Sequence, residues 1–127
     1  MTIALWCVLA AAFMPFIAIG IAKWTRGYDN SNPREWEAKL TGRRSRAHAA
    51  HLNSFEAFPM FAAGVIIATM TNAPQAVVDA IAVSFIVARA GYLWCYLNDR
   101  ARLRSLVWLA GFGLSAALFF VAAFAKS

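Results

Sequence analysis

The chain has 127 residues, 61% of them hydrophobic and only 14% charged, with a formal net charge of +6. An average soluble domain is about 45–50% apolar and about 25% charged, so this composition is typical of a membrane protein. The basic excess does not indicate nucleic-acid binding, because the basic residues flank apolar segments instead of lining one soluble face. The length fits a single domain over residues 1–127.

Residues 2–22 form the first predicted membrane span. They carry no charged side chain, and at about 1.5 Å per residue they are long enough to cross about 30 Å of hydrocarbon. The uncharged run is longer than the apolar region of a signal peptide, about 7–15 residues, and no basic residue precedes it, so we expect a retained span. Pro15 favours a kink within it. The span ends at Lys23 and Trp24, a cation and an amphipathic ring of the kind that lies at the membrane interface.

Three further spans are predicted after a long connection over residues 23–45. Within this connection, Pro33–Leu40 predicts a short interfacial helix that begins at a proline. The spans cover residues 46–70, 75–96 and 105–125, and the last of them again contains no charge. The predicted fold is therefore an all-α membrane protein, a four-transmembrane-helix bundle.

The distribution of basic residues predicts the orientation in the membrane. Seven lie in the first connection when it is taken through Arg46, three lie in the third and none lies in the second. Because cytoplasmic loops carry the excess of Lys and Arg, we expect the first and third connections in the cytoplasm and both termini on the opposite side. The residues counted are Lys23, Arg26, Arg34, Lys39, Arg43, Arg44 and Arg46, then Arg100, Arg102 and Arg104.

Three polar residues of the second span, Arg46, Asn53 and Glu56, are predicted to share one helix face. A charged residue within the bilayer costs about 2.5–3.5 kcal/mol on insertion scales, and such residues usually face a bundle interior or a wet cavity. A polar network that links helices is one explanation for them. For Glu56 we favour a ligand site, because helix packing alone is a weak explanation for an acid this deep.

Histidines and cysteines do not predict a metal site. His48 and His51 share another face of the same helix, but such a pair lacks the further ligands that zinc needs, and we favour a packing role. Cys7 and Cys95 lie in separate predicted spans, without a CxxC or Cys/His spacing, and are expected to pack as small residues.

The third span carries Arg89, Tyr92 and Tyr96 on one stripe. Tyrosines near a helix end are usually interfacial, whereas Arg89 lies deeper and is predicted to pair with Glu56. Arg104-Ser105 adjoins the fourth span and presents a cation and a hydroxyl suited to an anionic ligand. These residues predict a pocket at the cytoplasmic interface for a small anionic or zwitterionic ligand, beside an apolar ligand that enters from the lipid.

The same residues form one extended motif. It runs from Arg46-Ala47 to Asn53-x-x-Glu56-x-x-Pro59 and continues with Arg89, Tyr92, Tyr96 and Arg104-Ser105. With this motif, four spans and this length, the chain resembles the MAPEG family (membrane-associated proteins in eicosanoid and glutathione metabolism). It is more similar to the bacterial members than to the mammalian synthases.

The resemblance implies a homotrimer that binds glutathione, as co-substrate, between neighbouring subunits near the cytoplasmic surface. Arg104 is the implied cation that stabilises the thiolate, and Ser105 is a second implied catalytic residue. The implied partners are membrane lipid and a lipophilic small molecule. The implied glutathione-binding residues are Lys23, Arg46, Asn53, Glu56, Arg89, Tyr92 and Tyr96.

The function implied by the resemblance is that of a glutathione-dependent membrane enzyme, a transferase or peroxidase that acts on a lipophilic electrophile or hydroperoxide. The alternative is a non-catalytic membrane binding or scaffold protein of the same fold. The eicosanoid enzymes of the family carry a further Arg four residues before the motif Asn, where this chain has Ala49. This difference removes one expected carboxylate contact and strengthens the alternative. A transporter subunit is disfavoured, because the sequence shows no broken helix pairs or inverted repeats.

Overall fold

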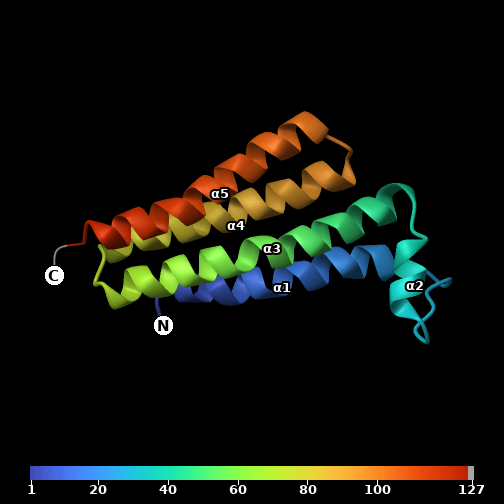
Figure 1. The fold of residues 1–127 in the computed structure, drawn as a ribbon, viewed down its shortest axis with the longest axis horizontal. Helices are drawn as coiled ribbons and strands as arrows, with labels where there is room; N and C mark the ends of the chain where they lie inside the picture. Colours follow the sequence, from blue (N-terminus) through green and yellow to red (C-terminus); the bar gives the residue numbers. More distant parts are fainter. Residues whose placement is uncertain (126–127) are drawn as a thin grey trace.

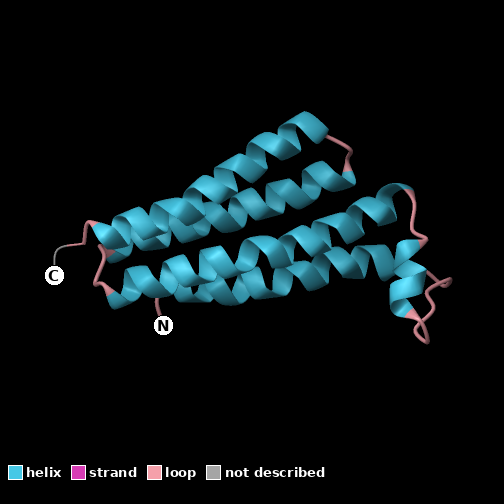
Figure 2. Cartoon of the chain, viewed as in Figure 1, coloured by secondary structure: helices cyan, strands magenta, loops and turns pink. Residues whose placement is uncertain are grey.

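The computed structural model describes residues 1–125, and within them the chain forms five helices and no strand (Figure 1 and Figure 2). Four of these helices are long and apolar enough to cross a membrane. This confirms the predicted all-α fold with four membrane-spanning helices. The helices are α1 (Ile3–Lys23), α2 (Pro33–Ala38), α3 (Gly42–Met70), α4 (Gln75–Leu97) and α5 (Ala101–Ala123).

The largest differences from the predicted spans are at the starts of α3 and α5, which begin four residues earlier than predicted, at Gly42 and Ala101. Arg104 therefore lies in the first turn of α5 rather than in the connection before it. The short helix α2 also ends earlier than predicted, at Ala38 instead of Leu40. Charge counting placed the start of the last span after its arginines, but a helix can continue beyond the hydrocarbon as long as its backbone is hydrogen-bonded.

The connections after α3 and α4 use the same compact turn. Asn72 and Asp99 each adopt a φ of 54°, a left-handed conformation that Asn and Asp tolerate better than most residues. In the first of these turns the backbone N–H of Ala73 donates to the carbonyl of Ala68 over 3.0 Å, which satisfies a carbonyl at the helix end. Each turn therefore reverses the chain within a few residues and keeps successive helices antiparallel.

The bundle consists of two antiparallel helix pairs that lie side by side, α1 with α3 and α4 with α5 (Figure 1). The N-terminus and the end of α5 lie at one end of the bundle, and α2 and the α4–α5 turn lie at the other. Phe61 of α3 and Phe85 of α4 stack between the pairs, with ring centroids 3.9 Å apart and planes 8° apart. All connections that carry basic residues are therefore at the same end.

Helices α3 and α5 approach closely at Gly64. A Cβ atom at this position would lie 3.0 Å from Cβ of Leu118 and 3.2 Å from the ring of Phe119. Membrane helices often use small residues to pack this tightly. Gly64 therefore fixes the distance between α3 and α5 beneath the polar residues of α3.

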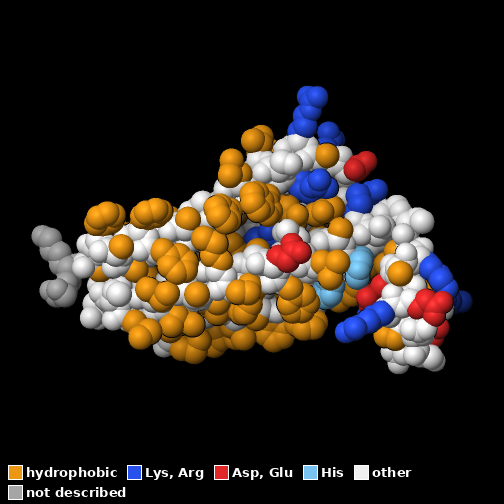
Figure 3. All heavy atoms as spheres, in the orientation of Figure 1, with side chains coloured by type: hydrophobic (Ala, Val, Ile, Leu, Met, Phe, Trp, Pro, Cys, Tyr) orange, Lys and Arg blue, Asp and Glu red, His pale blue; other side chains and the backbone are white. Residues whose placement is uncertain are grey.

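The outer faces of the four long helices are strongly apolar. Phe13 and Phe16 of α1 and Leu106 and Phe120 of α5 are among the large apolar side chains that are exposed. Figure 3 shows hydrophobic side chains along the whole body, with most Lys and Arg gathered near α2 and the α4–α5 turn. An outer surface of this kind suits acyl chains and supports an integral, multi-pass membrane protein.

Candidate functional site

The centre of the candidate site is the guanidinium of Arg89, which α4 presents to α3. Arg89 is only 6% exposed. Its Nη1 donates to Oδ1 of Asn53 over 3.0 Å, and its Nη2 donates to Oγ of Ser54 over 3.3 Å. Two adjacent polar residues of α3 thus satisfy part of a charge that is costly to bury.

The predicted direct ion pair between Arg89 and Glu56 is wrong. Within residues 1–125 the two side chains form no ion pair, and Asn53 lies between them. The Nδ2 of Asn53 donates to Oε2 of Glu56 over 3.1 Å, while its Oδ1 accepts from Arg89. An amide has both a donor and an acceptor, so it can join a cation to an anion. Glu56 is left exposed beside the buried Arg89.

Aromatic rings extend the site from α4 to α5. The guanidinium of Arg89 lies 4.4 Å from the ring centroid of Tyr92. Tyr92 and Tyr96 meet edge to face, with centroids 5.2 Å apart. Arg104 of α5 lies 4.3 Å from the centroid of Tyr96, and Nε of Arg46 donates to the Tyr96 carbonyl over 2.9 Å. Cation–π contacts are favourable within about 6 Å of a centroid, so each guanidinium is held by a ring or a carbonyl instead of a carboxylate.

Eight residues form one set of connected contacts, which we call the polar cluster. It brings together most of the site residues that the sequence predicted. Its members are Arg46, Asn53, Ser54, Glu56, Arg89, Tyr92, Tyr96 and Arg104, where Ser54 is the one addition to the predicted set.

A cavity of about 220 Å³ opens beside the polar cluster, between α3, α4 and α5. Asn53, Glu56 and Arg89 form its polar wall. Figure 3 shows an acidic side chain with a basic one beside it, midway along the otherwise apolar body. The remaining wall is mostly apolar and contains Ala57, Met60, Phe85, Trp108, Gly111, Phe112 and Ser115. The cavity therefore offers charged groups next to a surface that apolar groups can contact.

Two predicted site residues lie outside the polar cluster of one chain. Nζ of Lys23 forms an ion pair with Oε1 of Glu37 at 2.9 Å, which ties α2 to the end of α1. Oγ of Ser105 donates to the carbonyl of Ala101 over 3.2 Å, so this hydroxyl is turned toward its own helix. Within one chain, neither side chain extends the contacts between Glu56 and Arg104.

The two histidines link α3 to neighbouring helices. Nδ1 of His51 donates to the carbonyl of Pro15 in α1 over 2.7 Å. Nδ1 of His48 is buried without a hydrogen-bond partner and lies 3.9 Å from Oε2 of Glu37 in α2. The histidines therefore face α1 and α2, whereas the polar cluster faces α4 and α5.

The α5 side of the cavity was not among the features predicted from the sequence. The rings of Trp108 and Phe112 stack with centroids 5.5 Å apart, and Ser115 follows on the same face. Their spacing of i, i+4 and i+7 is visible in the sequence. Aromatic residues on a membrane helix usually face lipid or a partner helix, so this spacing alone does not mark a cavity wall.

The comparison with protein families agrees with this geometry. The model of the MAPEG family matches residues 3–124, nearly the whole chain. Comparisons with curated proteins and with solved structures found no match. The family includes glutathione transferases and peroxidases as well as non-catalytic members. Because the match covers all four long helices and every residue of the polar cluster, the chain belongs to the MAPEG family.

Proposed function

We propose that the protein is a glutathione-dependent membrane enzyme that conjugates or reduces a lipophilic substrate. One observation carries the proposal: continuous contacts join Glu56 to Arg104 through an amide, a buried guanidinium and two phenol rings. Glutathione carries two carboxylates, an ammonium group and a thiol. A ligand of this kind needs cations, an anion and hydrogen-bonding groups within one site.

The cluster residues suit these groups individually. Arg46 and Arg89 suit the two carboxylates, since guanidinium forks bind carboxylates with two parallel hydrogen bonds. Glu56 is exposed beside the cavity and suits the ammonium group. Asn53 suits the peptide amides, because it can donate and accept. Arg104, at the far end, is the proposed neighbour of the sulfur.

Arg104 is the proposed thiol-activating residue. A free thiol has a pKa of about 8.5, and a nearby cation lowers it because it favours the thiolate. In conjugation the thiolate sulfur forms a bond to an electrophilic carbon, and the leaving group departs with its bonding electron pair. In hydroperoxide reduction two glutathione molecules are oxidised to the disulfide, and the hydroperoxide becomes an alcohol and water. Ser105 remains a second proposed catalytic residue.

We propose that the site is completed in a homotrimer. Cavities that hold small molecules usually measure about 300–1,000 Å³, more than the roughly 220 Å³ that one chain provides. The exposed position of Glu56 leaves the cavity open on one side. A neighbouring subunit can supply the missing wall, and Lys23 at the end of its α1 is the proposed contact with glutathione.

We also propose that the α2 end of the bundle faces the cytoplasm. The first and third connections lie at this end, and they and the adjoining helix ends hold all ten basic residues that the orientation rule counts. The polar cluster then opens near the cytoplasmic surface, where water-soluble glutathione is available. The lipophilic substrate approaches from the bilayer.

A non-catalytic membrane protein of the same fold is the second candidate. Ala49 takes the place of an arginine that the eicosanoid enzymes carry, which removes one carboxylate contact. In addition, Arg89 is satisfied by groups of its own chain, so the cluster also serves helix packing. Under this alternative the polar cluster stabilises helix packing, and the protein does not turn over glutathione.

Two measurements on the purified protein in mild detergent separate the candidates. The enzyme is expected to bind glutathione-agarose, to elute with free glutathione, and to conjugate glutathione to chlorodinitrobenzene or oxidise it with a lipid hydroperoxide. Light scattering is expected to give the mass of a trimer. A protein that binds glutathione-agarose but turns over neither substrate supports the non-catalytic candidate. A protein that neither binds glutathione-agarose nor turns over a substrate rejects a glutathione site.

A further inference from the structure

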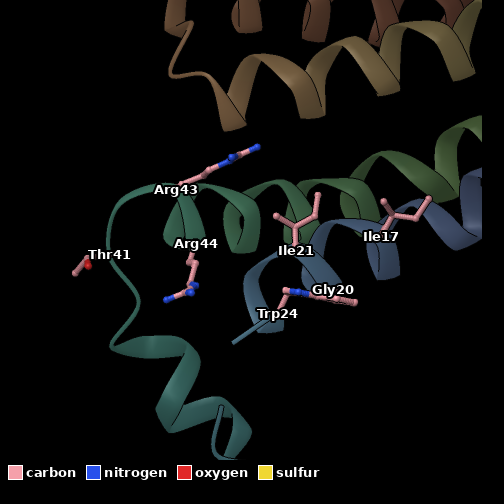
Figure 4. Close-up of a pocket in the computed structure, with 7 residues that line it drawn as sticks. All are labelled: Ile17, Gly20, Ile21, Trp24, Thr41, Arg43 and Arg44. Atoms are coloured by element: carbon pink, nitrogen blue, oxygen red, sulfur yellow. The ribbon is translucent and has the colours of Figure 1, made fainter. Parts of the chain in front are cut away.

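A groove of about 830 Å³ runs between the end of α1 and the start of α3. None of its lining residues belongs to the polar cluster. Figure 4 shows Ile17 and Ile21 projecting from α1, while Arg44 extends from α3 alongside the last turn of α1. Its main lining residues are Ile17, Gly20, Ile21 and Trp24 on α1, and Arg43 and Arg44 on α3.

The α1 side of the groove is an apolar strip. Residues at i, i+3, i+4 and i+7 share one helix face, and from Ile17 to Trp24 this face is roughly 10 Å long. Ile17 is 57% exposed and Trp24 is 89% exposed. A Cβ atom at Gly20 would meet nothing within 4 Å, so the glycine leaves open space in the middle of the strip. The strip is therefore shaped to receive a long apolar group.

The α3 side of the groove carries uncompensated positive charge. Arg43 and Arg44 are exposed, and neither forms an ion pair within residues 1–125. The two acids of nearby α2 already pair with lysines, Glu35 with Lys39 and Glu37 with Lys23. The groove therefore has two guanidinium groups whose counter-ion must come from outside the chain.

We propose that this groove binds one anionic phospholipid, with its phosphate beside Arg43 and Arg44 at the start of α3 and one acyl chain along α1. Guanidinium groups bind phosphate through paired hydrogen bonds, and a tryptophan ring is favoured at the depth of the headgroups. Clusters of basic residues beside a membrane helix recognise anionic lipids. A zwitterionic lipid fits this groove less well, because its ammonium group is repelled by the same two arginines.

Native mass spectrometry of the full-length protein in detergent tests the charge side of the proposal. Phosphatidylglycerol and phosphatidylcholine with identical acyl chains are titrated separately, and wild type is expected to prefer phosphatidylglycerol. The Arg43→Gln/Arg44→Gln variant is expected to bind phosphatidylglycerol about 30-fold more weakly and to lose the preference. The matched control is Arg26→Gln/Arg34→Gln, which removes the same charge from the same end of the bundle but not from the groove. Equal losses in both variants would show a net-charge effect and overturn the proposal.

The Gly20→Leu variant tests whether an acyl chain lies along the apolar strip of α1. The added side chain has room in the groove and should occupy the path of the acyl chain, so retention of phosphatidylglycerol is expected to fall at least fivefold. Circular dichroism and gel filtration establish that the variant keeps its helix content and its oligomeric mass. Glycerol phosphate, which has no chains, is expected not to displace the lipid. Three results would overturn the proposal. The Gly20→Leu variant could bind phosphatidylglycerol as well as wild type does, or bind it with an altered oligomeric mass. Glycerol phosphate could displace phosphatidylglycerol from wild type.

Discussion

The guanidinium of Arg104 lies 4.3 Å from the ring centroid of Tyr96, which places a charge from the first turn of α5 over the end of α4. The carbonyl of Tyr96 accepts a hydrogen bond from Arg46 of α3 over 2.9 Å. Three helices therefore meet at one residue. The contact holds Arg104 in position without a carboxylate, so its positive charge remains available to an anionic ligand.

Replacement of Arg104 by alanine is expected to remove thiol activation. Loss of one preorganised electrostatic contact to a reacting group typically lowers turnover by about 10²–10³-fold. We expect a loss of this size in conjugation of glutathione to chlorodinitrobenzene. The ultraviolet absorbance of the thiolate should also decrease when glutathione is bound to Arg104→Ala, because the thiol pKa returns toward about 8.5.

Arg102→Ala is the matched control for this variant. It removes the same charge from the same turn of α5, but Arg102 is exposed and is not part of the polar cluster. Wild-type turnover in Arg102→Ala, together with an unchanged oligomeric mass in both variants, assigns the effect to the position of Arg104. Wild-type turnover in Arg104→Ala rejects the proposed role.

The bridge formed by Asn53 predicts a loss of stability in Asn53→Ala. The substitution removes one of the two hydrogen bonds that Arg89 makes to α3 and leaves a buried donor unpaired, which costs about 1–3 kcal/mol. Thermal unfolding in detergent should show a lower midpoint for this variant. Ser54→Ala removes the longer bond to Arg89 and is expected to have the smaller effect. A larger loss of stability in Ser54→Ala than in Asn53→Ala would contradict the central position of Asn53.

The arrangement of charges shows how far the sequence alone could predict the site. The rule that intramembrane charges are partnered correctly indicated that Arg89 would be satisfied by the second span. It could not indicate which side chain would do so. Glu56 and Asn53 are three residues apart on one face, and the choice between them depends on how α4 is placed relative to α3. That placement is set by contacts such as the stack of Phe61 on Phe85, which no periodicity in the sequence specifies.

The helices were easier to predict than the cavity. Long uncharged runs give the number and approximate limits of the spans, since every backbone group in a membrane must be hydrogen-bonded within a helix. Trp108 and Phe112 look like ordinary lipid-facing residues in the sequence, and only the packing of α5 against α3 and α4 makes them part of a cavity wall. The arginines at the start of α5 have a similar ambiguity, because they give the orientation signal and one of them, Arg104, also belongs to the site.

The close approach at Gly64 predicts that Gly64→Ala destabilises the bundle. The new methyl group would lie 3.0 Å from Cβ of Leu118, a backbone-fixed atom, so α3 and α5 must separate slightly. Overpacking of this kind typically costs about 1–3 kcal/mol. Gly113→Ala is the matched control, because a Cβ there meets nothing within 4 Å. A thermal unfolding midpoint that falls in Gly64→Ala and stays constant in Gly113→Ala is the expected result, and equal midpoints would contradict it.

The proposed orientation predicts which engineered cysteines can be labelled from the cytoplasm. In a background with Cys7→Ser and Cys95→Ala, Ser31→Cys lies in the first connection and Thr71→Cys lies in the second, and both positions are exposed. The basic residues of the first connection resist translocation, so Ser31→Cys should face the cytoplasm and Thr71→Cys the opposite side. In sealed vesicles with the cytoplasmic face inward, a membrane-impermeant maleimide should modify Thr71→Cys alone. In inverted vesicles it should modify Ser31→Cys alone. The opposite labelling pattern would place the polar cluster near the non-cytoplasmic surface, away from the glutathione of the cytoplasm, and would contradict the proposed orientation.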